Sequence, residues 1–174
     1  MDSELWYAVL IAAVVVERIA ELVVSQRNAS WAVGQGGVET GRRHFPPMVL
    51  LHTGLLAACL IEVLVSDRPF LAPLAAIMLA LVLAAQGLRW WCIATLGRRW
   101  NTRVIVVPGL PLVVGGPYRW LRHPNYLAVV VEGIALPLVH TAWLTALAFT
   151  ALNAILLLGF RIPAEERALD SASA

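Results

Sequence analysis

The sequence predicts an all-α integral membrane protein with about five transmembrane helices and no Rossmann domain. Of its 174 residues, 60% are hydrophobic and only 14% are charged, whereas soluble domains carry about 25% charged residues. Apolar runs close to the length that crosses a bilayer, about 20 residues, recur along the chain. No glycine-rich nucleotide-binding motif follows a strand-like run. We expect a single domain over residues 1–174.

The first predicted span covers residues 5–25, and its second half contains charged side chains. Arg18, Glu21, Ser25 and Asn28 follow helical spacing, so they form one stripe on a helix. Charges at this depth normally face a protein interior or water. The stripe is therefore either a packing device within the bundle or the polar wall of a substrate cavity.

The next spans are separated by turn-forming residues. We expect a glycine-rich polar loop over residues 26–45, and then Pro46-Pro47 opens a second span over 46–65. A tight connection leads to a third span over 70–91, which makes an antiparallel pair with the second. That span ends in Arg89-Trp90-Trp91, a combination typical of the membrane interface.

The longest polar section runs over residues 95–124. Prolines and glycines between Pro108 and Pro117 argue against a continuous helix there. The last two spans are predicted at 126–140 and 142–160, and their short combined length suggests a tilted or shortened hairpin. A charged tail, beginning at Arg161, is expected to start another helical turn.

The distribution of arginine predicts the orientation. With five spans, loops 26–45 and 92–125 and the tail lie on one side, where most arginines gather, whereas the opposite side holds only Arg68. This asymmetry predicts an integral membrane protein with its N-terminus outside and its polar clusters facing the cytoplasm. A net charge of +2 gives no support for nucleic-acid binding. The sequence specifies no oligomeric state.

The densest polar and aromatic cluster spans Gly115 to Tyr126. Its tyrosines and histidine can stack on a heteroaromatic group, Arg122 can pair with a carboxylate, and the acidic pair Glu165-Glu166 can bind hydroxyls or an amine. The alternative is that the arginines and tyrosines only anchor the protein at the membrane interface. The four histidines are scattered and the two cysteines lack ligand spacing, so we expect no metal site.

Two motifs carry a resemblance to a known family. Arg122 to Tyr126 reads R-H-P-N-Y after Gly116-Pro117-Tyr118, and the tail contains Arg161-x-x-x-Glu165-Glu166. This combination resembles the isoprenylcysteine carboxyl methyltransferase family and its phospholipid methyltransferase relatives. Ala128 stands where the family usually has glycine. The resemblance implies an integral membrane methyltransferase that uses S-adenosylmethionine.

The resemblance also implies roles for individual residues. Arg161 would position the acceptor. Contacts with the cofactor are implied for Arg103, Leu110, Pro111, Leu112, Val113, Tyr118, His123, Pro124, Asn125, Tyr126 and Glu165.

The N-terminal half resembles the bacterial branch of the family, whose members are similar to O-methyltransferases of alkylpyrones and alkylresorcinols. On that resemblance, the acceptor would meet Glu21, Arg27, Asn28, His44 and His52. It would be a lipophilic molecule from the bilayer, with a prenylcysteine-like carboxylate or a ring hydroxyl. Transfer to an oxyanion needs mainly alignment and charge placement; if a base is needed, His44, His52 or Glu21 could serve. The alternatives are a phospholipid amine N-methyltransferase and a non-enzymatic membrane subunit.

Overall fold

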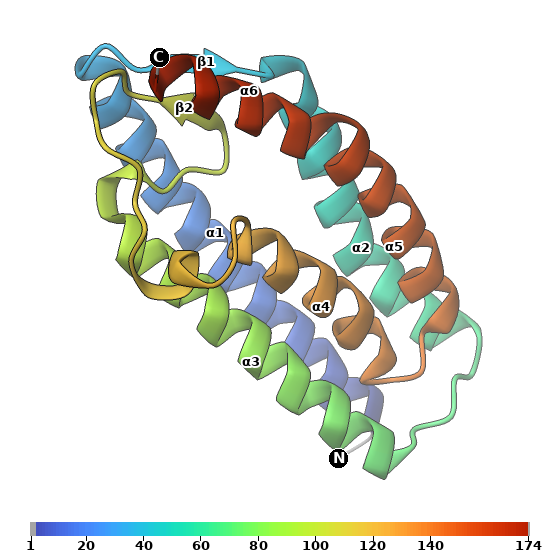
Figure 1. Ribbon diagram of the computed structural model, residues 1–174. Coiled ribbons are helices and arrows are strands. Elements are labelled where there is room, and N and C mark those ends of the chain that lie inside the picture. The colour runs from blue at the N-terminus through green and yellow to red at the C-terminus, as the bar shows by residue number, and fades with distance from the viewer. Residues whose placement is uncertain (1–2, 174) are drawn as a thin grey trace.

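The computed structural model describes residues 3–173, with side chains through residue 170, and it is mostly helical. Within this part, the two short strands form one antiparallel pair and no Rossmann-like sheet is present. Figure 1 labels the elements in chain order: α1 (Ser3–Gly34), β1 (Val38–Thr40), α2 (Phe45–Val65), α3 (Ala72–Leu96), β2 (Val104–Val106), α4 (Pro124–Leu138), α5 (Trp143–Leu156) and α6 (Ile162–Ser173).

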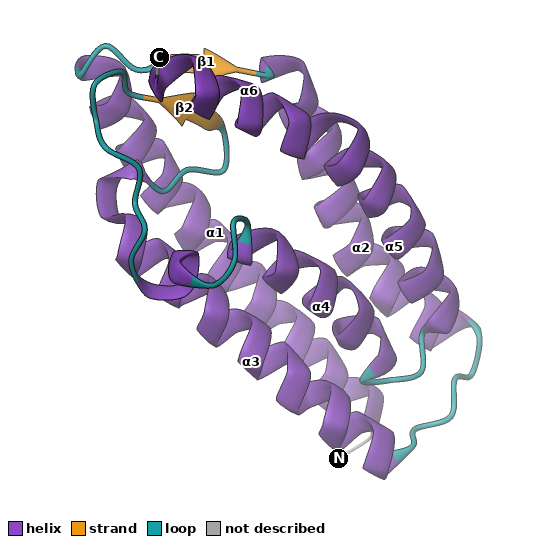
Figure 2. Cartoon of the chain, viewed as in Figure 1, coloured by secondary structure: helices purple, strands orange, loops and turns teal. Residues whose placement is uncertain are grey.

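The long helices run side by side as a bundle (Figures 1 and 2). Helix α4 packs against both α3 and α5, and α5 packs in turn against α2. The core of the bundle contains Tyr7 and Ile11 from α1, Val82 from α3 and Leu136 from α4. The strands and α6 lie together at the end opposite the first residues of α1. The longest polar section therefore gathers at one end of the bundle.

Helix α1 is longer than the sequence suggested. The predicted loop over residues 26–45 is wrong in its first part, because α1 continues to Gly34. The buried stripe of this helix continues through Ser25, Asn28 and Ala32. The side chains of Ser25 and Asn28 form hydrogen bonds with the segment between α3 and β2. This polar segment resembles a loop in the sequence, but it is helical because its polar side chains find hydrogen-bond partners in a distant part of the chain.

The third predicted span also ends too early. Helix α3 continues to Leu96, and Gly97 ends it with a positive φ of 55°. Trp90 and Trp91 are exposed, as expected for the membrane interface, but Arg89 is only 4% exposed. The prediction that Arg89 belongs to an interfacial belt is wrong, because two carboxylates inside the bundle bind its guanidinium.

The C-terminal helices form one nearly continuous rod (Figure 1). A wide π-turn over Leu157–Arg161 joins α5 to α6. Pro163 explains this turn, because a proline has no N–H and its ring clashes with the carbonyl four residues earlier in a regular helix. The expected helical turn at the tail is confirmed, and it extends as α6 to Ser173.

Three helical segments of the described chain are long and apolar enough to cross a membrane: Arg42–Val65, Ala72–Arg99 and Trp143–Asp170. Helix α4 is apolar but shorter. Its length agrees with the expectation of a shortened final hairpin, and Pro137 lies near its end. The three long segments identify an integral membrane protein.

A buried carboxylate fixes the end of the bundle opposite the strands. Glu62 of α2 accepts hydrogen bonds from the backbone N–H groups of Leu144 and Thr145 and from the Thr145 hydroxyl. It also pairs with Arg68 at 2.8 Å. Glu62 thus caps the N-terminus of α5 from a neighbouring helix.

Candidate functional site

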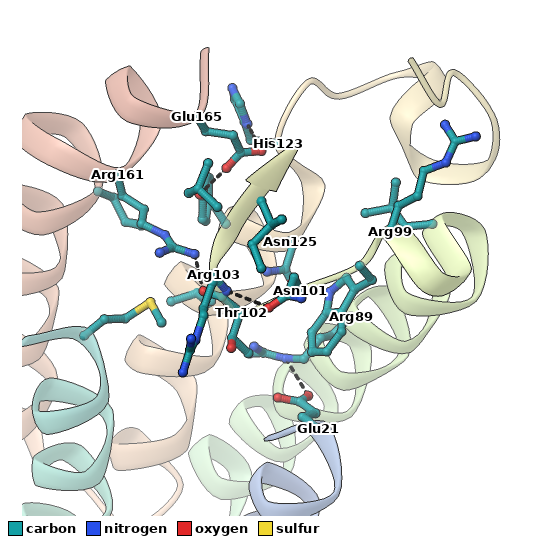
Figure 3. Close-up of a pocket in the computed structure, with 18 of the residues that line it drawn as sticks. Glu21, Arg89, Arg99, Asn101, Thr102, Arg103, His123, Asn125, Arg161 and Glu165 are labelled. Atoms are coloured by element: carbon teal, nitrogen blue, oxygen red, sulfur yellow. Dashed lines mark hydrogen bonds and ion pairs between the residues drawn. The ribbon is translucent and has the colours of Figure 1, made fainter. Parts of the chain in front are cut away.

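One cavity of about 640 Å³ extends from the strand end of the bundle down between the helices. The two segments that the sequence singled out, around His123 and around Arg161, both line it. Figure 3 shows Arg161, Glu165, His123 and Asn125 around the same space although they come from different elements. The fold therefore brings the polar loop and the tail together.

His123 joins the loop to the tail. It precedes Pro124 at the start of α4, and its ring stacks on Tyr126 with centroids 5.5 Å apart. Its two nitrogens lie 3.6 Å from Glu165 Oε1 and 3.5 Å from Glu166 Oε1, and the Tyr126 hydroxyl donates to Glu165. The neighbouring Glu165 carboxylate raises the pKa of His123 above its usual value, and partial burial opposes this effect.

Arg161 is buried, being 5% exposed, and it belongs to the π-turn at the start of the tail. Its Nη2 donates to the backbone carbonyl of Thr102. The wide turn keeps Arg161 and Glu165 both on the cavity wall. A guanidinium in so enclosed a place acts on neighbouring charge more strongly than one in water.

The segment that receives Arg161 is itself held by α1. Ser25 Oγ lies 2.7 Å from Thr102 Oγ1, donates to Asn101 Oδ1 at 2.9 Å and accepts from the Thr102 N–H at 3.0 Å. The amide of Asn28 donates to the carbonyls of Gly97 and Trp100. These bonds fix the position of the Thr102 carbonyl, to which Arg161 donates its hydrogen bond.

The other implied cofactor residues lie along the loop. The cavity is also lined by Leu110, Pro111, Leu112, Val113, Tyr118, Asn125 and Tyr126, whereas Pro124 is buried and does not form part of the wall. Arg99 donates to the carbonyl of Pro111 at 2.5 Å. Burial raises the pKa of the Tyr118 hydroxyl, next to Cys92.

The tight turn before Tyr118 depends on a glycine. Gly116 has a positive φ of 54°, and a Cβ there would collide with Thr95 and approach Trp91 Nε1 within 3.1 Å. A residue with a side chain would therefore be strained and would push this turn off α3.

Arg103 ties the loop to the lid formed by β1 and β2. It lines the cavity, but its guanidinium lies 3.7 Å from Glu39 Oε1 and 5.0 Å from the centre of the Phe45 ring. Val38 of β1 pairs with Val106 of β2. Because β1 precedes α2 in the chain and β2 belongs to the loop section, this pairing holds the start of α2 and the loop together over the cavity.

The five residues implied for the acceptor divide into two groups. Glu21 and His52 line the cavity. Arg27 is exposed, Asn28 uses its amide on backbone carbonyls, and the ring of His44 packs against Phe160. The structure thus brings only the first two to the cavity wall.

An ionic cluster also lines the cavity, and sequence reasoning missed most of it. It consists of Arg18, Glu21, Arg89 and Glu132 from three helices. Arg18 pairs with Glu21 at 2.5 Å and donates to both oxygens of Glu132, at 2.7 and 2.9 Å. Arg89 bonds to Glu132 and lies 3.3 Å from Glu21. The signal available in the sequence was Glu132, a lone carboxylate in an apolar run.

The polar end of the cavity fits the implied cofactor, S-adenosylmethionine. Asn125 Oδ1 and Arg161 Nε are buried there without a hydrogen-bond partner among the described residues. An amide oxygen can accept from an amino group, and a guanidinium N–H can donate to an anionic oxygen. Together with Glu165 and the aromatic rings, these atoms suit a ligand that is zwitterionic at one end and heteroaromatic at the other.

Comparison with known proteins agrees with the motifs. The model of the isoprenylcysteine carboxyl methyltransferase (ICMT) family matches residues 78–171. The chain is also similar to the uncharacterized protein YpbQ of Bacillus subtilis (strain 168), with 38% identity over 164 residues that cover 94% of this chain and 96% of the relative. The family match spans α3 to α6, the elements that carry the loop and the tail. The chain therefore belongs to the isoprenylcysteine carboxyl methyltransferase family, a family of membrane methyltransferases.

Proposed function

We propose that the protein transfers a methyl group from S-adenosylmethionine to an oxygen of a lipophilic acceptor. The observation that carries the proposal is that the loop and the tail, which hold the two family motifs, meet at the polar end of one cavity. The rest of that cavity is lined by apolar residues of the bundle, such as Val14, Leu56 and Val129. A polar cofactor and a lipid-like acceptor can therefore meet in it.

The cofactor end is formed by the loop and the tail. S-adenosylmethionine supplies an electrophilic methyl group when it is bound. Glu165 and Glu166 offer carboxylates to its amino or hydroxyl groups, and His123 and Tyr126 hold Glu165 in position. Tyr118 offers an aromatic face, and the apolar residues of 110–113 exclude water. The ion pair between Arg103 and Glu39 of β1 holds this loop against the strands.

Arg161 is the residue that would orient the acceptor. Its guanidinium can hold a negative oxygen through Nε, the N–H that has no partner within the described structure. A carboxylate like that of prenylcysteine, or an acidic hydroxyl of an alkylpyrone or alkylresorcinol, meets this requirement. A buried cation disfavours the binding of a cationic amine. The position of Arg161 therefore argues against methylation of a phospholipid amine.

The acceptor would enter from the bilayer. Leu22 of α1 and Val49 of α2 both line the cavity, and each is 37% exposed. These two residues would border a lateral opening between α1 and α2, through which an alkyl chain can extend into lipid.

We further propose that all five long helices cross the membrane, with α1 and α4 completing the three longer apolar segments. The arginine-rich strand end would then face the cytoplasm, where the cofactor is available, and the N-terminus would lie outside. The ionic cluster supports this assignment for α1, because its partners on α3 and α4 neutralise the charges of that helix.

Saturable binding of radiolabelled S-adenosylmethionine to the protein in detergent tests the proposal. We expect Glu165→Gln to weaken binding about tenfold or more, because it removes a charge-assisted contact. Glu4→Gln, the same change on the exposed start of α1, is the control and should leave binding unchanged. Absence of saturable binding, or equal binding by both variants, would refute the assignment of the cofactor end.

A further inference from the structure

The turn over residues 116–121, in the loop that leads to α4, carries exposed side chains that do not line the cavity: Arg119, Trp120 and Leu121. We propose that this turn is inserted into the headgroup region of the bilayer, where Arg119 binds the phosphates of anionic phospholipids. The surface lies outside the cavity and adds a partner to the proposed function. Only its effect on cofactor binding rests on that function.

The turn lies beside α3 and not beyond its end. The ring of Trp120 meets that of Trp91 edge to face, with centroids 5.8 Å apart, and Gly116 lies so close to Thr95 that a Cβ would collide with it. Trp91 is five residues before the end of α3 at Leu96, which is about 7.5 Å along a helix. Figure 1 shows the loop running back alongside α3 before α4 begins. The turn is therefore level with the last part of a segment that can cross a membrane.

The outer side of the turn continues the apolar surface of the bundle. Trp120 is 67% exposed and Leu121 is 42% exposed. Trp91, whose ring Trp120 contacts, is exposed too and belongs to the membrane-crossing segment of α3. Exposed apolar patches mark sites of interaction with proteins or membranes, and tryptophan is enriched where lipid meets water. The bilayer interface is the environment that suits this surface.

The charge of the loop section is complementary to anionic lipid. Residues 92–125 contain five arginines and no aspartate or glutamate. The guanidinium of Arg119 lies over the ring of Trp120, 5.9 Å from its centre, and it forms no ion pair with any residue that the structure describes. The side chain of Arg122 is 90% exposed and lies 3.9 Å from its partner Glu166. Phosphate groups can supply the missing anion, because the negative surface of an anionic membrane attracts nearby arginines.

The same turn carries part of the cavity wall. Tyr118, which lines the cavity, directly precedes Arg119, and His123 follows soon after the turn. The backbone hydrogen bonds of the turn stay within residues 115–121, so packing against α3 and contact with lipid hold it in place. Contact with phospholipid would therefore stabilise the position of Tyr118 at the cofactor end.

The depth of the turn in a bilayer tests its placement directly. The full chain is placed in nanodiscs of phosphatidylcholine and phosphatidylglycerol, and a nitroxide is attached at Leu121→Cys, since Cys59 and Cys92 are buried. Collisions of the label with oxygen and with a water-soluble nickel complex report its depth. Gln35→Cys, in the exposed turn after α1, gives the value for water, and Leu83→Cys on the exposed side of α3 gives the value for lipid. We expect Leu121→Cys to lie between them, with much less access to nickel than Gln35→Cys.

Binding of labelled phospholipids to the purified protein in detergent tests the charge. We expect Arg119→Gln to weaken phosphatidylglycerol binding about fivefold, because one arginine near an anionic surface contributes about that factor, and to leave phosphatidylcholine binding unchanged. Arg167→Gln is the matched control. It makes the same change at an exposed position of α6, a helix that also carries Glu166 and Asp170, and it should leave the binding of both lipids unchanged.

Cofactor binding in nanodiscs tests the link to the cavity. The wild type should bind S-adenosylmethionine about fivefold more tightly with phosphatidylglycerol present than in phosphatidylcholine alone, and Arg119→Gln should remove this difference. Equal cofactor affinity in the two lipids would overturn the anchoring role of the turn.

The lipid-binding surface itself is overturned if Leu121→Cys is as accessible to nickel as Gln35→Cys, if Arg119→Gln binds phosphatidylglycerol like the wild type, or if Arg167→Gln loses as much binding. These results leave methyl transfer untouched. Conversely, a protein that meets both lipid tests but binds no S-adenosylmethionine in either lipid would contradict the proposed function and leave the surface standing.

Discussion

Ser25 is expected to position Arg161 although the two residues do not touch. Ser25 is 3% exposed, and its hydroxyl accepts a hydrogen bond from the Thr102 N–H and lies against the side chains of Asn101 and Thr102. Thr102 in turn presents its carbonyl to Arg161. We predict that Ser25→Ala loosens this segment, so that the guanidinium is no longer held towards the acceptor.

The magnitude follows from the bonds that are lost. Alanine removes the acceptor of the Thr102 N–H and leaves it buried without a partner, which costs about 1–3 kcal/mol. We therefore expect the free energy of unfolding to fall by about 2 kcal/mol. Small displacements of a positioning group reduce rates strongly, so kcat/KM for the acceptor should fall about tenfold, chiefly through KM.

The control is on the same helix. Ser30 donates only to the carbonyl of Gln26 on the exposed face of α1, so Ser30→Ala should change stability and kcat/KM little. Denaturant unfolding in detergent and initial rates at varied acceptor concentration provide both readouts. If Ser25→Ala behaves like Ser30→Ala, α1 does not position Arg161.

Three further predictions concern the rest of the molecule. Glu62→Gln should lower the free energy of unfolding by about 1–3 kcal/mol, because the cap of α5 loses its charge, whereas Glu4→Gln should be neutral; thermal unfolding compares them. Gly133→Ala places a Cβ against an aromatic ring of α5 and should cost about 1–3 kcal/mol by overpacking, while Gly159→Ala, with open space around it, should not. The pKa of His123 is raised, so its protonated form stabilises the fold below about pH 6.5, and this contribution disappears as the pH rises through the raised pKa. The difference in free energy of unfolding between wild type and His123→Gln should therefore shrink from acid to alkaline pH. A difference that widens instead would contradict the pairing of His123 with the tail.

Helix positions could be predicted well because long apolar runs and prolines are local signals. Pro46-Pro47 lies in the first turn of α2, as expected, and α4 begins at Pro124, two residues before the predicted start of that span. The extension of α1 to Gly34 could not be predicted from its own composition, because Ser25 and Asn28 are stabilised by carbonyls and side chains some 70 residues later in the chain. Local polarity resembles a loop whenever its hydrogen-bond partners are remote.

The residues of the site also divide into those that local motifs reveal and those that depend on remote partners. The motifs around His123 and Arg161 identify the loop and the tail, and the structure brings both to one cavity. Arg89 was misassigned because an arginine beside two tryptophans is typical of an interface, and its partners Glu21 and Glu132 come from other helices. Pairing between helices is a tertiary property that a single sequence does not display.

Transfer of a radiolabelled methyl group tests the central claim most directly. Purified protein in detergent is incubated with labelled S-adenosylmethionine and, separately, a prenylated cysteine, an alkylresorcinol, an alkylpyrone and phosphatidylethanolamine. We predict that label enters an oxygen acceptor and that Arg161→Ala removes most of this transfer while cofactor binding persists. Label found only in phosphatidylethanolamine, or in none of the four acceptors despite saturable cofactor binding, would contradict the account.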